Sequence, residues 1–333
     1  MYLRLLAAAT AVSITCIGCG SGSGDPVAPS KPSSSTLRGQ LKLATASTVA
    51  DFPAVERRTL DQVATALDGT GPLVGLATSV FTPGVNRLAF GVIDKKTGFV
   101  YGKTAVYVAS TPGARARGPY PAPADLLITD APYRSETSAT EKDHFVAVYA
   151  AQVPFSKPGK YAVLVAINVN GKLVGATTVI NVVAKSKDSV VAVGKKAPRV
   201  ATDTVASAGG DVASIDTRIP PSTMHENSLK DVLGQRPVAL LFATSALCQS
   251  RVCGPVVDIA EQLKARYGDR MEFIHQEVYV GNKMSNGLRP ALKAFGLSTE
   301  PWLFVIDRNG EVVERLEGSF GFSAFEQAVK AGL

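Results

Sequence analysis

Two cysteines, Cys248 and Cys253, are the residues of this chain whose type and spacing most clearly allow chemistry. They follow a short, unbroken apolar run, Val238–Phe242, which predicts a fully buried strand. After them, apolar residues recur at helical spacing from Val256, and the pattern stops at Gly268. The amide groups and the dipole of a helix N-terminus stabilise a thiolate. This stretch therefore predicts a reactive thiol pair between a strand and a helix.

The C-x4-C spacing restricts where the two cysteines can lie. Two residues five positions apart in a regular α-helix have Cα atoms ~9 Å apart, whereas a disulfide tolerates at most about 7 Å. Cys248 therefore lies in the loop before the helix, or the first helical turn unwinds when the bond forms. Pro255 favours unwinding because it removes a helix hydrogen bond. We expect the redox state of the pair to be coupled to local conformation.

The order of elements over residues 193–333 resembles the thioredoxin superfamily. The expected elements after the cysteine helix are a strand at Met271–Tyr279, a helix at Gly287–Phe295, a closing hairpin at Ser298–Gly318 that turns at Asn309-Gly310, and a final helix at Ser323–Ala331. The resemblance implies an α/β domain spanning residues 194–333. It also places Pro301 where that family keeps a cis-proline facing the cysteines.

The resemblance implies thiol–disulfide exchange, which needs one exposed thiolate and one resolving thiol. Cys248, the earlier cysteine, would attack, and Cys253 would resolve the mixed disulfide. Arg251 between them would stabilise the thiolate. Pro301 would present the backbone of Glu300 to an extended substrate. The partner would be an exported protein with a thiol or disulfide, and no cofactor is required.

Three other functions remain open at the same pair. The spacing resembles that of Q-type peroxiredoxins, whose motif also places a serine or threonine where Ser245 stands. Copper chaperones of the Sco type bind copper with two cysteines and a histidine, here Cys248, Cys253 and His275, and sulfur and imidazole ligands suit copper. In the last alternative the disulfide is only structural and the chain is a binding module.

The N-terminus resembles a bacterial lipoprotein signal peptide, residues 1–19. An apolar run too short for a membrane span ends in Cys-Ile-Gly-Cys, so Cys19 would carry the lipid. Residues 20–50 are rich in Gly, Ser, Pro and Thr and predict a flexible tether. We expect a lipid-anchored protein on the outer face of a cell membrane. That compartment permits disulfides.

The middle of the chain, residues 51–184, predicts an all-β immunoglobulin-like sandwich. Seven β-rich segments alternate with turn residues such as Pro83-Gly84 and Asn170-Gly171. They are LVGLATSVF, NRLAFGVID, FVYGKTAVYVAS, DLLIT, DHFVAVYAAQ, KYAVLVAINV and KLVGATTVINVVA. A short helix is expected within Asp51–Leu67. No catalytic constellation occurs here, so this domain is expected to bind a partner or act as a spacer.

A basic linker, residues 185–199, joins the two expected domains. The formal net charge of +7 is modest for 333 residues and forms no patch interleaved with aromatic residues. Nucleic-acid binding is therefore not expected. The sequence as a whole predicts a multidomain protein in which the immunoglobulin-like sandwich precedes the thioredoxin-like domain.

Overall fold

The computed structural model describes residues 34–136, 138, 145–248 and 253–333. The expected signal peptide, the cysteine expected to carry lipid (Cys19) and Arg251 lie outside the described residues. Within them, no helix is both long and apolar enough to cross a membrane.

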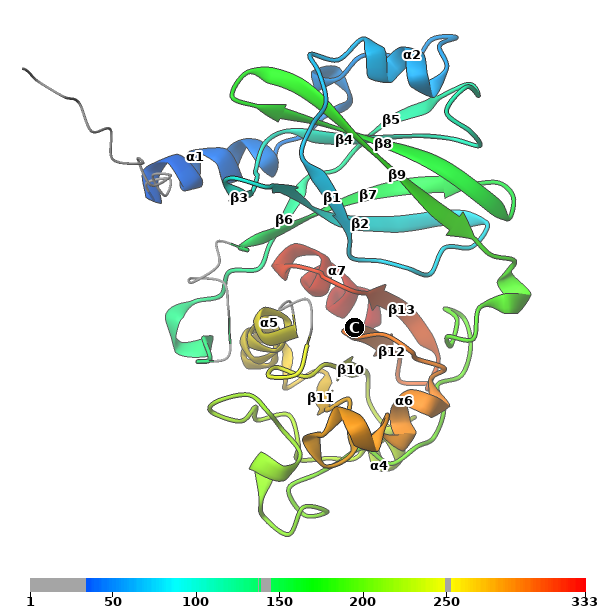
Figure 1. The fold of residues 1–333 in the computed structure, drawn as a ribbon. Coiled ribbons are helices and arrows are strands. Elements are labelled where there is room, and N and C mark those ends of the chain that lie inside the picture. Colours follow the sequence, from blue (N-terminus) through cyan, green and yellow to red (C-terminus); the bar gives the residue numbers. More distant parts are fainter. Residues whose placement is uncertain (1–33, 137, 139–144, 249–252) are drawn as a thin grey trace, which may run out of the picture. The chain divides into compact units, whose positions relative to one another are not determined.

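Two antiparallel sheets form the N-terminal part of the described chain (Figure 1). Their strands are β1 (Leu73–Leu76), β2 (Gly84–Asp94), β3 (Gly98–Phe99), β4 (Thr104–Ala109), β5 (Arg117–Pro121), β6 (Ala124–Leu126), β7 (Ala147–Phe155), β8 (Gly159–Val169) and β9 (Lys172–Val182). One sheet has the order β1-β2-β7-β6, with β3 also paired to β2, and the other has the order β5-β4-β8-β9. The inner faces bury alternate residues such as Leu88 and Phe90 of β2 against Val106 and Val163.

The two strands with no expected counterpart of their own are β3 and β5. The segment FVYGKTAVYVAS divides into β3 and β4. β5 contains Pro119 and Pro121, and proline cannot donate to a strand ladder. β5 nevertheless forms because it is the last strand in the order of its sheet, and an edge strand needs only one side of its ladder.

A helix, α1 (Ser34–Ala44), occupies part of the segment that composition predicted to be a flexible tether. Leu37, Leu41 and Ala44 form an apolar stripe at helical spacing and pack against the sandwich core. Packing supplies the stability that a helix of this length lacks in isolation. The prediction of a flexible tether was therefore wrong for α1.

The segment between α1 and β1 covers the outer face of the sheet with the order β5-β4-β8-β9. It contains η1 (Val49–Asp51) and α2 (Leu60–Thr65), the helix expected within Asp51–Leu67. Leu60 and Val63 of α2 pack on Tyr107 and Leu164. This cover explains why every residue of β4 is buried, on both faces of its sheet.

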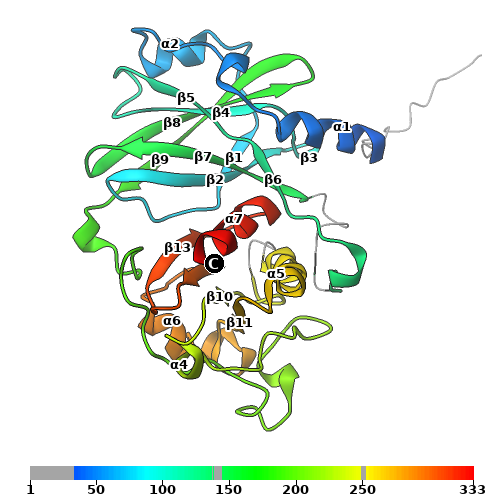
Figure 2. The same ribbon diagram turned by 180° about the vertical axis from the view of Figure 1, so that it is seen from behind.

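The C-terminal part contains a four-stranded mixed sheet with the order β11-β10-β12-β13. The strands are β10 (Val238–Phe242), β11 (Glu272–Gln276), β12 (Trp302–Ile306) and β13 (Val312–Glu317), and the helices are α4 (Leu229–Val232), α5 (Cys253–Tyr267), α6 (Pro290–Ala294) and α7 (Phe322–Gly332). β10 pairs in parallel with β11 and antiparallel with β12. The apolar residues of α5 and α7 belong to one core cluster and those of α4 and α6 to another, which the sheet separates (Figure 2).

The order strand, cysteine loop, helix, strand, helix, hairpin and helix is that expected of a thioredoxin-like region. The closing hairpin turns through Asp307–Glu311, where Gly310 has φ +78° and the Asp307 carboxylate accepts from the amides of Asn309 and Glu311. The expected helix at Gly287–Phe295 is shortened to α6, and the expected strand at Met271–Tyr279 is shortened to β11.

The segment expected to be the linker packs along the edge of the hairpin. The amide of Gly194 donates to the carbonyl of Val312 (2.8 Å), and that of Ala197 donates to the carbonyl of Gly310 (2.9 Å). Further hydrogen bonds join residues far apart in the sequence: Arg87 donates to the carbonyl of Ser319 (2.7 Å). Such contacts satisfy the exposed edge of β13 and the chain that follows it.

Candidate functional site

The buried strand β10 immediately precedes the segment that contains the two cysteines. All five of its residues are buried, because one core cluster packs on each face of the sheet. One further backbone bond, from the amide of Ala243 to the carbonyl of Gln276 (3.2 Å), extends the pairing with β11. Cys248 follows in the loop, and Cys253 is the first residue of α5. The structure thus places Cys248 ahead of the helix, the first alternative that the spacing allows.

The two sulfurs differ in exposure and in acidity. Both cysteines are thiols, and their side chains are hydrogen-bonded to each other. Cys253 is fully buried, whereas Cys248 is partly exposed. Burial raises the pKa of Cys253 well above its usual value, and the neighbouring Cys248 and the charge of Glu300 raise it further. The exposed sulfur is therefore the one that can meet a substrate, and the buried one stays protonated until the pair reacts.

A carboxylic acid, Glu300, lies close enough to influence both sulfurs. Burial raises its pKa first, and the negative charge of Cys248 adds to the rise. Tyr279 donates its phenolic hydrogen to this carboxyl group and lowers the pKa of Glu300, which only partly offsets the rise. Glu300 precedes Pro301, and the peptide bond between them is cis. A carboxyl group whose pKa is raised in this way is suited to exchange protons with the neighbouring thiols.

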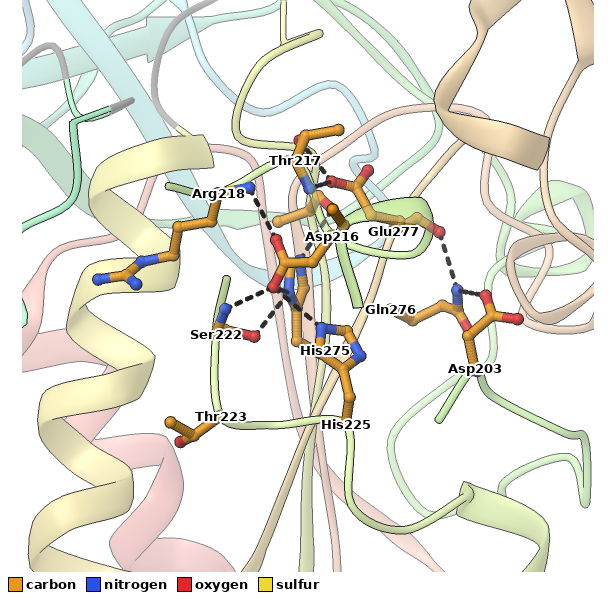
Figure 3. Close-up of polar contacts among 12 residues, drawn as sticks. Asp203, Asp216, Thr217, Arg218, Ser222, Thr223, His225, His275, Gln276 and Glu277 are labelled. Carbon is orange, nitrogen blue, oxygen red and sulfur yellow. Dashed lines mark hydrogen bonds and ion pairs between the residues drawn. The ribbon is translucent and has the colours of Figure 1, made fainter. Parts of the chain in front are cut away.

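A buried carboxylate, Glu277, lies against Thr217 (Figure 3) and through that residue supports the cysteine loop. It accepts from the amide of Thr217 (2.8 Å) and from the hydroxyl of the same residue (2.5 Å). The hydroxyl oxygen in turn accepts from the amide of Ala246 (3.0 Å), two residues before Cys248. Because Glu277 also bears a charge that raises the pKa of Glu300, it couples the position of the loop to the electrostatics of the site.

His275 lies in a different group from the one the copper alternative requires. Its Nδ1 is 3.1 Å from the hydroxyl of Ser222, and its Nε2 is 3.1 Å from the carbonyl oxygen of Ala243. Burial lowers the pKa of His275, but the charge of Asp216 opposes this, and the net pKa is raised to about 8. Among the described residues, the group close enough to share a metal ion is Asp216, His225 and His275, which includes neither cysteine.

Sequence reasoning singled out Glu300 for its backbone alone and missed Tyr279, Glu277 and Thr217. Two of these carry a positional signal: Glu277 directly follows β11, and Tyr279 lies three residues beyond the end of that strand. β11 is the neighbour of the strand that leads to the cysteines. Thr217 has no such signal. It is 60 residues from Glu277 in the sequence, and only the folded chain brings the two together.

Comparisons with known proteins give weak similarities. No model of a known protein family matches the chain, and no curated protein matches it. Two solved structures from Chlorobium tepidum are similar to parts of it. A putative thiol:disulfide interchange protein DsbE is 21% identical over 43% of this chain and 98% of its own, with a TM-score of 0.31. A thiol:disulfide interchange protein of the thioredoxin family is 17% identical over 42% and 97%, with a TM-score of 0.30.

A third solved structure, the PKD domain from human VPS10 domain-containing receptor SorCS2, is 14% identical over 36% of this chain and 80% of its own, with a TM-score of 0.18. Because these identities and TM-scores are low, they carry no argument about the fold. The thioredoxin-like architecture of the C-terminal region is inferred from its element order and sheet register.

Proposed function

We propose that this protein exchanges thiols and disulfides with a protein substrate through Cys248 and Cys253. The observation that carries the proposal is the hydrogen-bonded thiol pair at the start of α5, one sulfur partly exposed and the other buried. The nearby carboxyl group of Glu300 acts electrostatically on both sulfurs. Exchange needs an attacking thiolate, a resolving thiol and a proton acceptor, and this site holds a candidate for each.

The exchange proceeds in two balanced steps. The thiolate of Cys248 attacks one sulfur of a substrate disulfide, so that a mixed disulfide forms and a substrate thiolate leaves. Cys253 then loses its proton and attacks the Cys248 sulfur, which forms the Cys248–Cys253 disulfide and releases the second substrate thiolate. We assign the proton of Cys253 to Glu300, whose raised pKa suits it to accept and return that proton. Two electrons pass to the substrate, and the reverse sequence oxidises it.

A polypeptide substrate suits the surroundings of Glu300. A groove of about 640 Å³ lies beside Thr299 and Glu300, and its lining is mainly apolar. Leu76, Phe99 and Phe145 contribute to it from the N-terminal part of the chain. We infer that this part, an immunoglobulin-like sandwich in our proposal, serves the exchange by holding substrate rather than by chemistry of its own.

The test of exchange uses single cysteine variants of the full chain. When Cys253→Ser is treated with oxidised glutathione, Cys248 should form a mixed disulfide with one glutathione, located by peptide mass. Cys248→Ser should form no such adduct at Cys253 under the same conditions, because that thiol is buried. In the reduced wild type, alkylation should modify Cys248 much faster than Cys253. Equal alkylation rates, or a native disulfide that resists dithiothreitol, would leave only a structural bond.

We also propose that the chain is a lipoprotein anchored by Cys19 on the outer face of a membrane. The apolar run that ends in Cys-Ile-Gly-Cys supports this proposal, and an oxidising compartment suits a disulfide-exchanging pair. Cys19→Ala should abolish lipid attachment and release the protein from the membrane fraction. Membrane attachment that persists in this variant, with no lipid on the wild type, would contradict the anchor.

A further inference from the structure

Three buried side chains, which include neither cysteine of the thiol pair, converge on one point (Figure 3). They are Asp216, His225 and His275, which are 2%, 1% and 0% exposed. One potential ligand atom from each lies within 4.8 Å of the others. Asp216 is a hydrogen-bond partner of both histidines, whereas His225 Nδ1 is buried with no hydrogen-bond partner among the described residues. Buried polar atoms are rarely left in this state, and the exchange reaction gives the group no role.

The distances within the group match those around a four-coordinate metal ion. Asp216 Oδ2 lies 3.0 Å from His225 Nε2 and 3.3 Å from His275 Nδ1. Zinc binds imidazole nitrogen and carboxylate oxygen at about 2.0–2.2 Å, which places neighbouring tetrahedral ligands ~3.3 Å apart. These two separations therefore suit a bound ion, and the ligand nitrogens of the two histidines lie within 4.8 Å of each other.

The hydrogen bonds of His275 and Asp216 orient them as metal ligands. His275 Nε2 is 3.1 Å from the carbonyl oxygen of Ala243, which can only accept, so Nε2 carries a hydrogen. In the neutral ring this leaves Nδ1 as a lone pair, and that lone pair faces a carboxylate oxygen of Asp216. A proton on Nδ1 or a bound metal ion relieves the repulsion between these two acceptors, and a metal ion would take the place of that proton. A carbonyl that fixes the tautomer in this way is the usual outer partner of a metal-bound histidine.

The carboxylate itself is held in place by backbone groups. The amide of Arg218 donates to Oδ1 (2.8 Å), and the amide of Ser222 donates to Oδ2 (2.7 Å). The hydroxyl of Ser222 lies 3.1 Å from His275 Nδ1, so a further oxygen is already at the edge of the group. Preorganised ligands of this kind lower the entropic cost of binding an ion.

We propose that Asp216, His225 and His275 form a structural site for a divalent transition-metal ion. Two imidazole nitrogens and one carboxylate oxygen suit Zn²⁺ best among such ions, and the hydroxyl of Ser222 or a water molecule completes the coordination. Because all three ligands are buried, the ion stabilises the fold rather than binding substrate. It ties the loop that carries Asp216 and His225 to β11, and through Ala243 it reaches the end of β10 that leads to the cysteines.

The test titrates the reduced, chelator-treated full chain with Co²⁺ and then Zn²⁺. Binding should saturate at one equivalent and give visible d–d absorption without thiolate-to-cobalt charge transfer. Zn²⁺ should displace cobalt and raise Tm, because an ion that binds only the native state stabilises it. The double variant Cys248→Ser/Cys253→Ser should give the same spectrum, which separates this site from the thiol pair and its proposed exchange.

Two ligand variants and one matched control complete the experiment. Asp216→Asn and His225→Gln should weaken Co²⁺ binding by more than the roughly 10- to 100-fold that loss of an outer-shell partner costs. Glu226→Gln removes an exposed carboxylate beside His225 and should leave binding unchanged. If the ligand variants fail to fold, the spectrum of the Cys248→Ser/Cys253→Ser protein decides the question. No one-equivalent binding, thiolate bands that vanish with the cysteines, or binding that survives both ligand variants overturns the proposal in favour of a buried imidazolium paired with Asp216.

Discussion

Two carboxyl groups in different regions of this molecule have raised pKa values but serve different roles, one structural and one beside the reactive thiols. Asp125 lies in β6 of the N-terminal part, and Glu300 lies beside the thiol pair. Burial raises the pKa of both. The groups around them differ: Asp125 faces hydrogen-bond donors and a cation, whereas Glu300 faces mainly negative charge. A raised pKa by itself therefore does not distinguish a structural acid from a reactive one.

Asp125 acts as a cap for a helix that begins almost 200 residues later. Its Oδ2 accepts from the amides of Gly321 (2.8 Å) and Ala324 (3.1 Å), and its Oδ1 accepts from the amide of Ser323 (2.9 Å). These are the unpaired N–H groups at the start of α7, where the helix dipole also favours a negative charge. A Cβ at residue 321 would lie 2.5 Å from the carbonyl oxygen of Leu126, so the approach requires glycine.

Among the described residues, Tyr279 donates to Glu300, and the other electrostatic neighbours, Cys248 and Glu277, are acidic. Burial and the negative charge of Cys248 both raise the pKa of Glu300, so its protonation depends on the state of the thiol pair. Several hydrogen-bond donors hold a carboxylate such as Asp125 in one position. Negatively charged neighbours make a carboxylate such as Glu300 easier to protonate, so it can exchange protons. The following predictions test this distinction, beginning with the larger effect.

Asp125→Ala should give the larger loss of stability. Three backbone N–H groups lose their acceptor at a buried helix start, which costs roughly 1–3 kcal/mol. Urea unfolding should show a lower midpoint, while the alkylation rate of the exposed thiol in the native protein should be unchanged.

Asp125→Asn is the matched control for this prediction. Its amide keeps one oxygen acceptor but turns an NH2 donor toward the remaining N–H group, so its midpoint should lie between those of Asp125→Ala and the wild type. If Asp125→Ala is as stable as the wild type, or if it alters thiol reactivity without altering stability, the contrast between the two acids is wrong.

Glu300→Gln should change reactivity with little change in stability, because this side chain is only half-buried. The repulsion between Glu300 and the sulfurs is reciprocal, so ionised Glu300 disfavours the thiolates. The variant should therefore be alkylated severalfold faster at Cys248 above the raised pKa of Glu300. Below that pKa the wild-type residue is neutral too, and the two proteins should react alike. Alkylation rate against pH measures the effect.

Resolution of the mixed disulfide should become slower in Glu300→Gln, because Cys253 loses its proton acceptor. Faster alkylation together with slower turnover would separate the electrostatic role of Glu300 from its role as a base. Alkylation profiles that coincide at every pH would show that Glu300 does not act on the thiols.

Tyr279→Phe supplies the smaller, matched change. Removing the phenolic donor should raise the pKa of Glu300 further, because that hydrogen bond lowers it. Glu300 then stays neutral to a higher pH, so alkylation should accelerate slightly, in the same direction as in Glu300→Gln. The increment should vanish when Glu300→Gln is already present, and an additive effect would place Tyr279 outside this pathway.

The sequence by itself determined the elements that local pattern encodes. The apolar run of β10, the helical spacing of α5 and the hairpin around Asn309-Gly310 each fix their own conformation through periodicity and turn chemistry. The same patterns located the cysteines between a strand and a helix. Because helix and strand periodicity depends on neighbours within a few residues, these features needed no knowledge of the rest of the chain.

Only the tertiary structure decided which distant groups meet. The α1 helix has no cover until the sandwich core forms, so composition alone predicted a tether. Asp125 accepts hydrogen bonds at the start of α7, and Thr217 supports the cysteine loop. Asp216 lies beside His275 in the buried group. Each of these contacts joins segments tens to hundreds of residues apart. Their formation depends on chain packing, which no local pattern of residues encodes.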